Sequence, residues 1–348
     1  MDDFVDPRET HHPRLTHKLL GQEAAEQRLI AAWQSGRLHH AWLLAGPRGI
    51  GKATLAYRFA RFLFTHPNPG SDTAHSLDVA PEATAAKLVA ARSHPDLLVV
   101  ERTIDQKTER LRSLVRVEDA RQASHFFSLS PAMGGWRVCI VDAADDLNSE
   151  SANSLLKVVE EPPARSVFLI VAHAPGRLLA TIRSRAIKLD LKPLATPSVV
   201  EAMRTLGAGE DSSAEELAAI AALSQGSPGR ALDLIGSQGA RLFLKFQDVA
   251  SRPPPFARAP LLEIAGHMKR LDAGEDFPVF SDLLSDWVAA AARERAVSEG
   301  VCAAQPWARA HQDIGHSIRR ANVLNLDRRQ VLLEAFASIE EAARLGSR

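Results

Sequence analysis

The spacing of hydrophobic residues divides the chain into two regions. Up to Leu194, short apolar runs alternate with longer segments in which apolar residues recur every three or four positions. The short runs predict buried strands, and the longer segments predict amphipathic helices. Strands that alternate with helices are typical of a parallel sheet with helices on both faces. We therefore expect residues 1–194 to form an α/β domain.

Five apolar runs predict the strands of this domain, and four longer segments predict its main helices. Pro162 and Pro163 end the last of these helices, because proline cannot continue the helical hydrogen-bond ladder. The predicted strands are HAWLLAG (40–46), PDLLVVE (95–101), RVCIVD (137–142), SVFLIVA (166–172) and AIKLDL (186–191). The predicted helices are GQEAAEQRLIAAWQSG (21–36), KATLAYRFARFLF (52–64), VRVEDARQASHFFSLS (115–130) and SESANSLLKVVEE (149–161).

Beyond Leu194 the helical spacing continues, and no run predicts a strand. SVVEAMRTLG, SAEELAAIAALSQG and SPGRALDLIG predict three short helices. The proline-rich SRPPPFARAP (251–260) predicts a linker or a helix break, and the residues after it have helical spacing. The chain thus divides into an α/β domain (1–194), a small helical lid (195–240) and a helical C-terminal domain (241–348).

The composition limits the location and the partners of the protein. The 348 residues include 42 basic and 42 acidic side chains, so no global positive field attracts nucleic acid. The polar start MDDFVDPRETHH is unlike a secretory signal, and no apolar run approaches the roughly 18 residues of a membrane span. Cys139 and Cys302 lie too far apart in sequence to suggest a zinc module. We expect a cytoplasmic protein without membrane contacts.

The segment AGPRGIGKATLAY (45–57) has the spacing of a phosphate-binding loop. Gly46, Gly51 and Lys52 fit G-x-x-x-x-G-K, with Gly49 inside the loop, between a predicted strand and a predicted helix. Backbone N–H groups at such a helix start can cradle phosphates, and the lysine can reach the β- and γ-phosphates. The alternative interpretation is a glycine-rich turn without a nucleotide.

Groups that hydrolysis requires are missing from this predicted site. Ala53 stands where the motif has Ser or Thr, so no hydroxyl is available there for Mg²⁺. Asp142 follows an apolar strand where an aspartate would hold the metal, but the next residue is Ala143 instead of a Glu that activates water. We interpret Asp145 and Asp146 as solvated charges. The two losses predict a core that no longer hydrolyses nucleotide.

Four segments give the chain a family resemblance. They occur in the order and at the spacing of bacterial clamp-loader subunits, and they are HAWLLAGPRGIGKATLA, RVCIVDAADDLNSESANSLLKVVEEPP, SVFLIVAHAPGRLLATIRSRAIKL and GSPGRAL. The chain resembles these AAA+ proteins of the DNA polymerase III holoenzyme from about residue 15 to about residue 240. The C-terminal block matches only in length and helical character. The resemblance implies an α/β AAA+ P-loop core, the helical lid and an all-α collar domain.

The resemblance also implies roles for individual residues. Arg185, in the sequence SRA, matches an arginine that reaches into the nucleotide site of a neighbouring subunit and stabilises charge on the γ-phosphate. The alternative is an arginine that caps or pairs locally at a strand start. Arg230, in GSPGRAL, matches a lid arginine that senses nucleotide, although it could simply face water. Gln22 matches the family segment beside the adenine.

The sequence departs from the family at two further places. Ala172 and His173 occupy the position of a polar sensor residue, so the sensor hydroxyl is absent. Many relatives carry a zinc-binding cysteine cluster before the sequence HPD, which is present here at 94–96. The preceding segment contains no cysteine, and its histidines alone do not make a metal site. We expect no zinc, and a loop or short helices over residues 65–95.

The favoured hypothesis is a clamp-loader subunit that does not hydrolyse ATP. It would stand at one end of a five-subunit ring with the tau/gamma and delta subunits and lend Arg185 to the adjacent ATPase subunit. It would help to place the sliding clamp on primed DNA during replication. No cofactor is required, and binding of ATP or ADP is left open. The chain would be part of a DNA-directed DNA polymerase holoenzyme, with no polymerase activity and little or no ATPase activity of its own.

Two other functions stay open from the residues alone. One is a motor subunit of the tau/gamma type, against which Ala53, Ala143 and Ala172 count, together with the lack of a long basic, proline-rich tail. The other is a stand-alone nucleotide-binding regulator, against which NSLLKVVEEPP counts. Direct DNA contact is also open, because RTIDQKTERLRSLVR (102–116) is basic on balance but mixed in charge.

Overall fold

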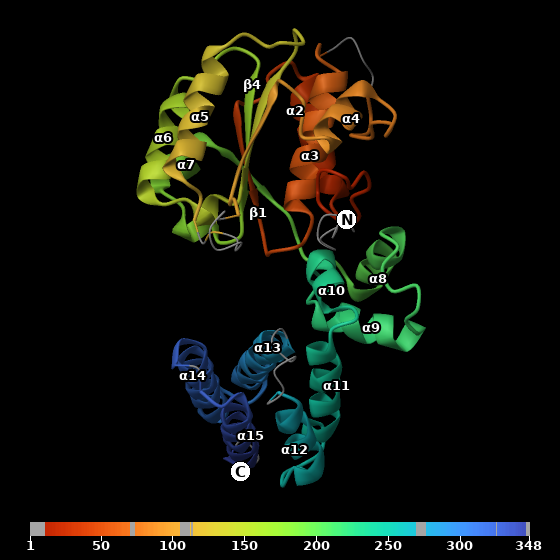
Figure 1. The fold of residues 1–348 in the computed structure, drawn as a ribbon, viewed down its shortest axis with the longest axis vertical. Coiled ribbons are helices and arrows are strands. Elements are labelled where there is room, and N and C mark those ends of the chain that lie inside the picture. Colours follow the sequence, from red (N-terminus) through yellow and green to blue (C-terminus); the bar gives the residue numbers. More distant parts are fainter. Residues whose placement is uncertain are drawn as a thin grey trace, which may run out of the picture. The chain divides into compact units, whose positions relative to one another are not determined.

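Two compact units make up the chain (Figure 1). The computed structural model describes residues 11–69, 74–104, 112, 114–268, 276–324 and 326–345. The first unit comprises Met1–Gly207 with Gln225–Arg230, and the second comprises Ala208–Ser224 with Ala231–Arg348. Residues 225–230, which the sequence analysis assigned to the lid, therefore belong to the first unit.

A parallel five-stranded sheet forms the centre of the first unit, and this confirms the predicted α/β fold class. The strand order is β2-β3-β4-β1-β5, and each strand lies within one of the predicted apolar runs. The register places Glu101 of β2 opposite Asp142 of β3 and Ala45 of β1 opposite Ala172 of β4. The strands are β1 (Ala41–Ala45), β2 (Leu97–Glu101), β3 (Arg137–Asp142), β4 (Ser166–Ala172) and β5 (Ile187–Asp190).

Helices cover both faces of the sheet, as the sequence pattern predicted (Figure 1). They are α2 (Glu23–Gln34), α3 (Lys52–Thr65), α4 (Thr84–Ala90), α5 (Val117–Ser128), α6 (Ser149–Glu160) and α7 (Ala180–Arg185). Successive residues of a strand point to opposite faces, so each face has its own hydrophobic core. Trp42 and Leu44 of β1 pack with α2 and α3, whereas Leu43 packs in the core that includes residues of α5, α6 and α7.

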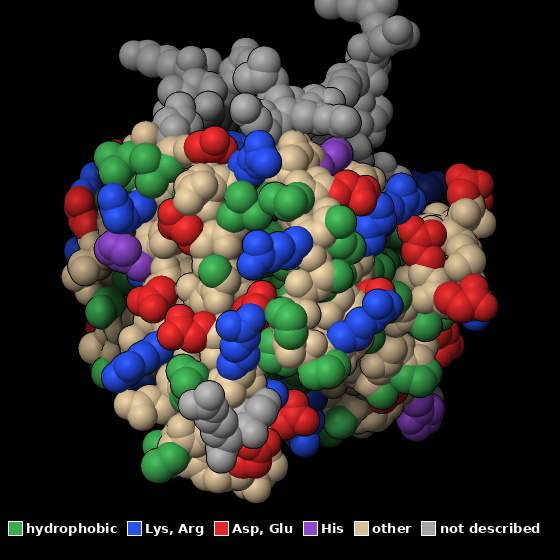
Figure 2. Space-filling model, turned by 90° about the horizontal axis from the view of Figure 1, so that it is seen from below, with side chains coloured by type: hydrophobic (Ala, Val, Ile, Leu, Met, Phe, Trp, Pro, Cys, Tyr) green, Lys and Arg blue, Asp and Glu red, His purple; other side chains and the backbone are tan. Residues whose placement is uncertain are grey.

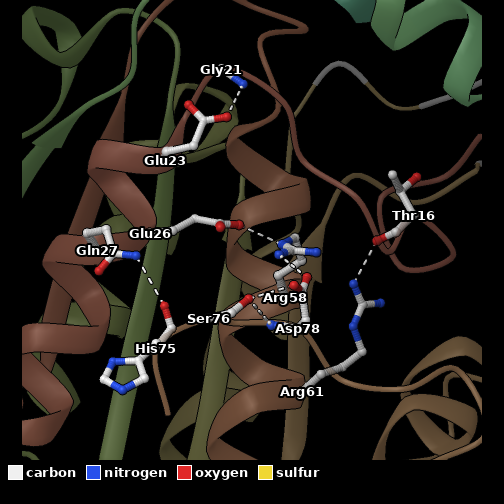
Figure 3. Close-up of polar contacts among 10 residues, drawn as sticks. All are labelled: Thr16, Gly21, Glu23, Glu26, Gln27, Arg58, Arg61, His75, Ser76 and Asp78. Atoms are coloured by element: carbon white, nitrogen blue, oxygen red, sulfur yellow. Dashed lines mark hydrogen bonds and ion pairs between the residues drawn. The ribbon is translucent and has the colours of Figure 1, made fainter. Parts of the chain in front are cut away.

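Polar contacts tie the segments on either side of α3 to that helix (Figure 3). Arg58 of α3 pairs with Glu26 of α2 at 2.7 Å and with Asp78 at 2.8 Å. Burial raises the pKa of Glu26, and the positive charge of Arg58 counteracts this effect. Arg61, one turn further along α3, donates to the carbonyl of Thr16 at 2.7 Å. The ion pair between Arg58 and Asp78 thereby fixes the segment before α4 to α3.

The described part of the second unit is helical, in agreement with the prediction. Its core is aromatic: Phe246 stacks on Phe336 with ring centroids 5.2 Å apart, and Phe280 packs edge-on against Phe246 at 6.2 Å. The helix α8 (Thr196–Thr205) belongs to the first unit, and α10 (Pro228–Leu234) begins there. The helices of the second unit include α9 (Ala214–Leu223), α11 (Gln238–Ala250), α12 (Arg258–His267), α13 (Asp276–Ser298), α14 (Val301–Leu324) and α15 (Arg328–Leu345).

Charged residues of both signs are mixed on the surface. On the described part of the face drawn in Figure 2, basic and acidic side chains alternate without a patch of a single sign. None of the described helices combines the length and the hydrophobicity that a membrane span requires. Most of the segment considered for DNA contact, residues 105–111 and 113, lies outside the described residues.

Candidate functional site

The phosphate-loop motif connects β1 to α3, as the sequence predicted. Gly46, Gly49 and Gly51 form the loop, and Lys52 is the first residue of α3. Gly49 and Gly51 have φ angles of 76° and 95°, which side chains larger than hydrogen rarely adopt. The motif thus forms a strand–loop–helix connection with glycine at two positions of positive φ.

Lys52 folds back onto its own loop. Its side chain is buried, and its ammonium group donates to the carbonyl of Gly46 at 2.7 Å and to that of Pro47. Burial lowers the pKa of Lys52 to about 8, and the nearby Asp142 and Asp145 partly offset this shift. The lysine therefore uses its donors within the loop.

A short segment of the first unit, residues 225–230, lies against the outside of the loop. The N–H of Gly229 donates to the carbonyl of Gly49 at 2.9 Å, and the hydroxyl of Ser227 donates to the carbonyl of Arg48 at 2.9 Å. A Cβ at Gly49 would lie only 2.4 Å from Oγ of Ser227 and 3.1 Å from the backbone nitrogen of Arg230. The close contact of two backbones requires glycine at this position.

Gln22 and Arg230 both lie beside the loop. The side-chain amide of Gln22 is buried and donates to the carbonyl of Ile50 at 3.3 Å and to that of Lys192 at 2.8 Å. Gln22 thus connects the loop to the residues after β5. Arg230 is half-buried, and its backbone N–H donates to Oγ of Ser227 at 3.1 Å.

Asp142 is the last residue of β3 and lies near Lys52 of the phosphate loop. Burial raises its pKa to about 6, and the neighbouring carboxylate of Glu101 adds to this effect. Lys52 opposes the shift with its positive charge. A carboxyl group in these surroundings is ionised only in part near pH 6.

The interpretation of Asp145 and Asp146 as solvated charges is wrong. The carboxylate of Asp145 accepts hydrogen bonds from the N–H of His173 at 2.5 Å and of Ala174 at 2.7 Å. Asp146 pairs with Arg102 at 2.9 Å. The two hydrogen bonds that the Asp145 carboxylate accepts fix the turn after β4 to the loop after β3. Such a role depends on the pairing of β3 with β4, which local sequence does not encode.

His173 occupies the position of the missing sensor hydroxyl. Burial lowers its pKa to about 4, and the positive charge of Lys52 lowers it further. Its Nδ1 is buried, with no hydrogen-bond partner among the described residues. The imidazole is therefore neutral at physiological pH.

Arg185 is the last residue of α7 and lies away from the phosphate loop. Only Ala186 separates it from β5, at the edge of the sheet where strands begin, whereas the phosphate loop follows the end of β1. Its guanidinium pairs with Glu160 at 2.9 Å, and the side chain is 39% exposed. Nη1 also donates to the carbonyl of Thr181 at 3.2 Å. The structure thus brings the other predicted site residues together and leaves Arg185 on a separate surface.

Metal ligands do not gather in the described part of the chain. Among those residues, no group of three or more His, Cys, Asp or Glu side chains is placed to hold a metal ion. His94, in the HPD sequence, stacks on Phe64 with ring centroids 3.7 Å apart. Asp96 is buried and accepts the N–H groups of Ala132 and Met133 at 2.8 and 2.9 Å. His94 and Asp96 of the HPD sequence therefore contact other residues of the protein and hold local structure together.

Comparison with known proteins decides the family. The family described as DNA polymerase III, delta subunit, matches residues 21–195, which is half of the chain. The delta-prime subunit of DNA polymerase III from Pseudomonas aeruginosa is 37% identical over 203 residues, 58% of this chain and 57% of that protein. The chain belongs to the DNA polymerase III delta-prime family. The aligned part covers less than two thirds of that relative.

Some relatives of this delta-prime family chain are named as another subunit of DNA polymerase III. The tau/gamma subunit of Haemophilus influenzae is 30% identical over 184 residues, 52% of this chain and 24% of that protein. Among solved structures, a DNA polymerase III gamma subunit-related protein from Thermotoga maritima covers 93% of this chain and all of its own, with 16% identity and a TM-score of 0.47. The sequence relatives identify the chain as similar to subunits of the polymerase III clamp loader.

Proposed function

We propose that the chain is a clamp-loader subunit that does not hydrolyse ATP and that lends Arg185 to the nucleotide site of an adjacent subunit. In this proposal it assembles with tau/gamma and delta subunits in a five-subunit ring. The ring places a sliding clamp on primed DNA during replication. Relatives named as delta-prime and as tau/gamma subunits of DNA polymerase III support membership of such a complex.

The missing hydroxyl at position 53, beside a lysine that bonds to its own loop, is the observation that carries this proposal. Residues 225–230 bond to the carbonyls of Arg48 and Gly49, and Lys52 bonds to carbonyls of the loop itself. Magnesium-nucleotide needs an oxygen from the residue after the lysine, and Ala53 has none. The residues present therefore do not fit a bound magnesium-nucleotide, and the proposed function includes no step through one on this chain.

Arg185 supports the other half of the proposal. Its guanidinium is partly exposed and lies at the opposite edge of the sheet from its own phosphate loop, so a second subunit can approach it. A guanidinium supplied from outside a nucleotide site can accelerate phosphoryl transfer by about 10³- to 10⁵-fold in related NTPases. A subunit without hydrolysis of its own can act in this way.

Steady-state ATP hydrolysis and equilibrium nucleotide binding by the purified chain test the proposal. We expect no magnesium-dependent binding and no turnover above a buffer control. The tau/gamma subunit of the same loader is the positive control in both assays. Substantial turnover by the chain alone contradicts the proposal and favours a motor subunit.

A further inference from the structure

We propose that Glu160 is a positioning residue for Arg185: its carboxylate holds the guanidinium in the orientation needed by the neighbouring subunit. This inference rests on the proposed role of Arg185. The two side chains are 2.9 Å apart, at the carboxyl ends of α6 and α7. Both are partly exposed, at 39% for Arg185 and 45% for Glu160, so the pair lies on the surface that a partner can reach.

Packing between the two helices sets this distance. Ile182 of α7 is buried in the core that also contains Leu155 and Val159 of α6. Arg185 follows Ile182 by three residues, so both side chains lie on nearly the same side of α7. Pro162 comes two residues after Glu160 and prevents α6 from continuing. The end of α6 and the end of α7 are therefore held next to each other by the core.

The hydrogen bonds of Arg185 leave part of its guanidinium available. Nη2 bonds to Glu160, and Nη1 donates to the carbonyl of Thr181 at 3.2 Å and to the hydroxyl of Ser184 at 3.5 Å. A guanidinium has five N–H donors in a planar fork. The contacts fix the plane of the fork from one side, and the remaining donors can bind a phosphate oxygen.

Positioning matters more here than charge. Arginine is a long side chain with many rotamers, and a catalytic group that is held in place avoids the entropic cost of ordering at each turnover. An exposed ion pair contributes little to folding stability. Removal of Glu160 should therefore change the reaction at the neighbour's site without unfolding the chain. This separates a positioning role from a purely structural one.

The test uses the loader reconstituted with its partner subunits, sliding clamp and primed DNA. Glu160→Ala is compared with Glu161→Ala, which removes the exposed carboxylate next in sequence. We expect Glu160→Ala to lower kcat for stimulated ATP hydrolysis by about tenfold, with KM for ATP, subunit assembly and Tm unchanged. Glu160→Gln keeps a hydrogen-bond acceptor and should give an intermediate rate. Glu161→Ala should behave as the unmodified chain.

Arg185→Ala distinguishes failure of this inference from failure of the proposed function. If Arg185→Ala lowers kcat and Glu160→Ala leaves it unchanged or raises it, Glu160 does not position the arginine. If Arg185→Ala has no effect, the proposed role of Arg185 fails and the inference fails with it. The double variant should match Arg185→Ala alone, because Glu160 acts through the arginine. Additive losses would assign Glu160 a separate role.

Discussion

Ser227 lies over Gly49 of the phosphate loop, and its hydroxyl would be 2.4 Å from a Cβ placed on that glycine. The same hydroxyl donates to the carbonyl of Arg48, the residue before Gly49. A segment from beyond α8 thus occupies the outer side of a loop whose sequence is typical of nucleotide binding. A side chain at position 49 should therefore lower the stability of the fold.

Gly49→Ala should lower the free energy of unfolding of the first unit by more than the strain of alanine at a positive φ accounts for. Alanine at a positive φ costs about 1–2 kcal/mol, and here the added Cβ also collides with Ser227. Gly36→Ala is the matched control, because Gly36 has a φ of 68° and no atom within 4 Å of an added Cβ. Urea unfolding measures both variants. Equal losses of unfolding free energy in the two variants would show that residues 225–230 do not contact the loop closely enough to exclude a side chain at position 49.

Ser227→Ala in combination with Gly49→Ala should recover part of the loss. The double variant removes the 2.4 Å collision and leaves a contact of 3.1 Å to the nitrogen of Arg230. Residues in contact give non-additive free energies of unfolding in a double-mutant cycle. Strict additivity of the two changes in the urea midpoint, at constant m-value, would contradict the observed contact.

Restoring the missing chemical groups should not restore nucleotide binding. Ala53→Ser supplies a hydroxyl for Mg²⁺, and Ala143→Glu supplies a carboxylate next to Asp142. Lys52 still bonds to the carbonyls of Gly46 and Pro47 in this double variant, so we expect no magnesium-dependent affinity for ATP. Titration calorimetry measures this, with a tau/gamma subunit as the positive control. Recovered binding would mean that the missing groups alone explain the loss.

The sequence was sufficient to predict the sheet, the helices α2, α3, α5 and α6 of the first unit, and the glycine-rich loop between β1 and α3, but not α7. Each of these depends on local periodicity or on a motif within a few residues, as in the run from Ala45 to Lys52. The family resemblance placed Arg230 near a nucleotide, but the bond from Ser227 to the carbonyl of Arg48, 179 residues earlier, was not predictable from local sequence. The Ser-Pro-Gly sequence at 227–229 indicated the start of a helix, and α10 does begin there, at Pro228.

The role of Asp145 and the partner of Arg185 also depend on tertiary structure. Asp145 can cap the turn at His173 because β3 pairs with β4. Glu160 was visible in the sequence only as part of a motif that ends in two prolines. Its contact with Arg185 arises from the packing of α7 on α6. Contacts between residues far apart in sequence, such as these two, could not be predicted from local sequence.

Asp142 and His173 should make opposite contributions to the dependence of stability on pH. The folded-state pKa of Asp142 is raised to about 6, so its contribution is present below its ordinary pKa and is lost as the pH rises through about 6. The folded-state pKa of His173 is lowered to about 4, so its contribution is present above its ordinary pKa and is lost as the pH falls through about 4.

Single substitutions separate the two contributions between pH 4 and pH 7. Relative to the unmodified chain, Asp142→Asn should gain stability as the pH rises, because it lacks the group whose contribution is lost. His173→Gln should lose less stability as the pH falls. Urea unfolding at a series of pH values measures both slopes. Parallel curves for all three proteins would show that neither group has a different pKa in the folded and the unfolded chain.

Arg185→Ala should lower ATP hydrolysis by the assembled loader while leaving assembly intact. The side chain is partly exposed and bonds mainly to Glu160 and Thr181 on its own surface, so its loss should change Tm little. A group that acts on the γ-phosphate during transfer affects kcat more than KM for ATP. Arg183→Ala is the matched control, since it removes an exposed arginine from the same helix. Stimulated ATPase assays and native mass measurement of the complex give the two readouts. A loss of kcat with either arginine would point to the charge of α7, whereas a loss confined to Arg185 would assign the effect to that guanidinium.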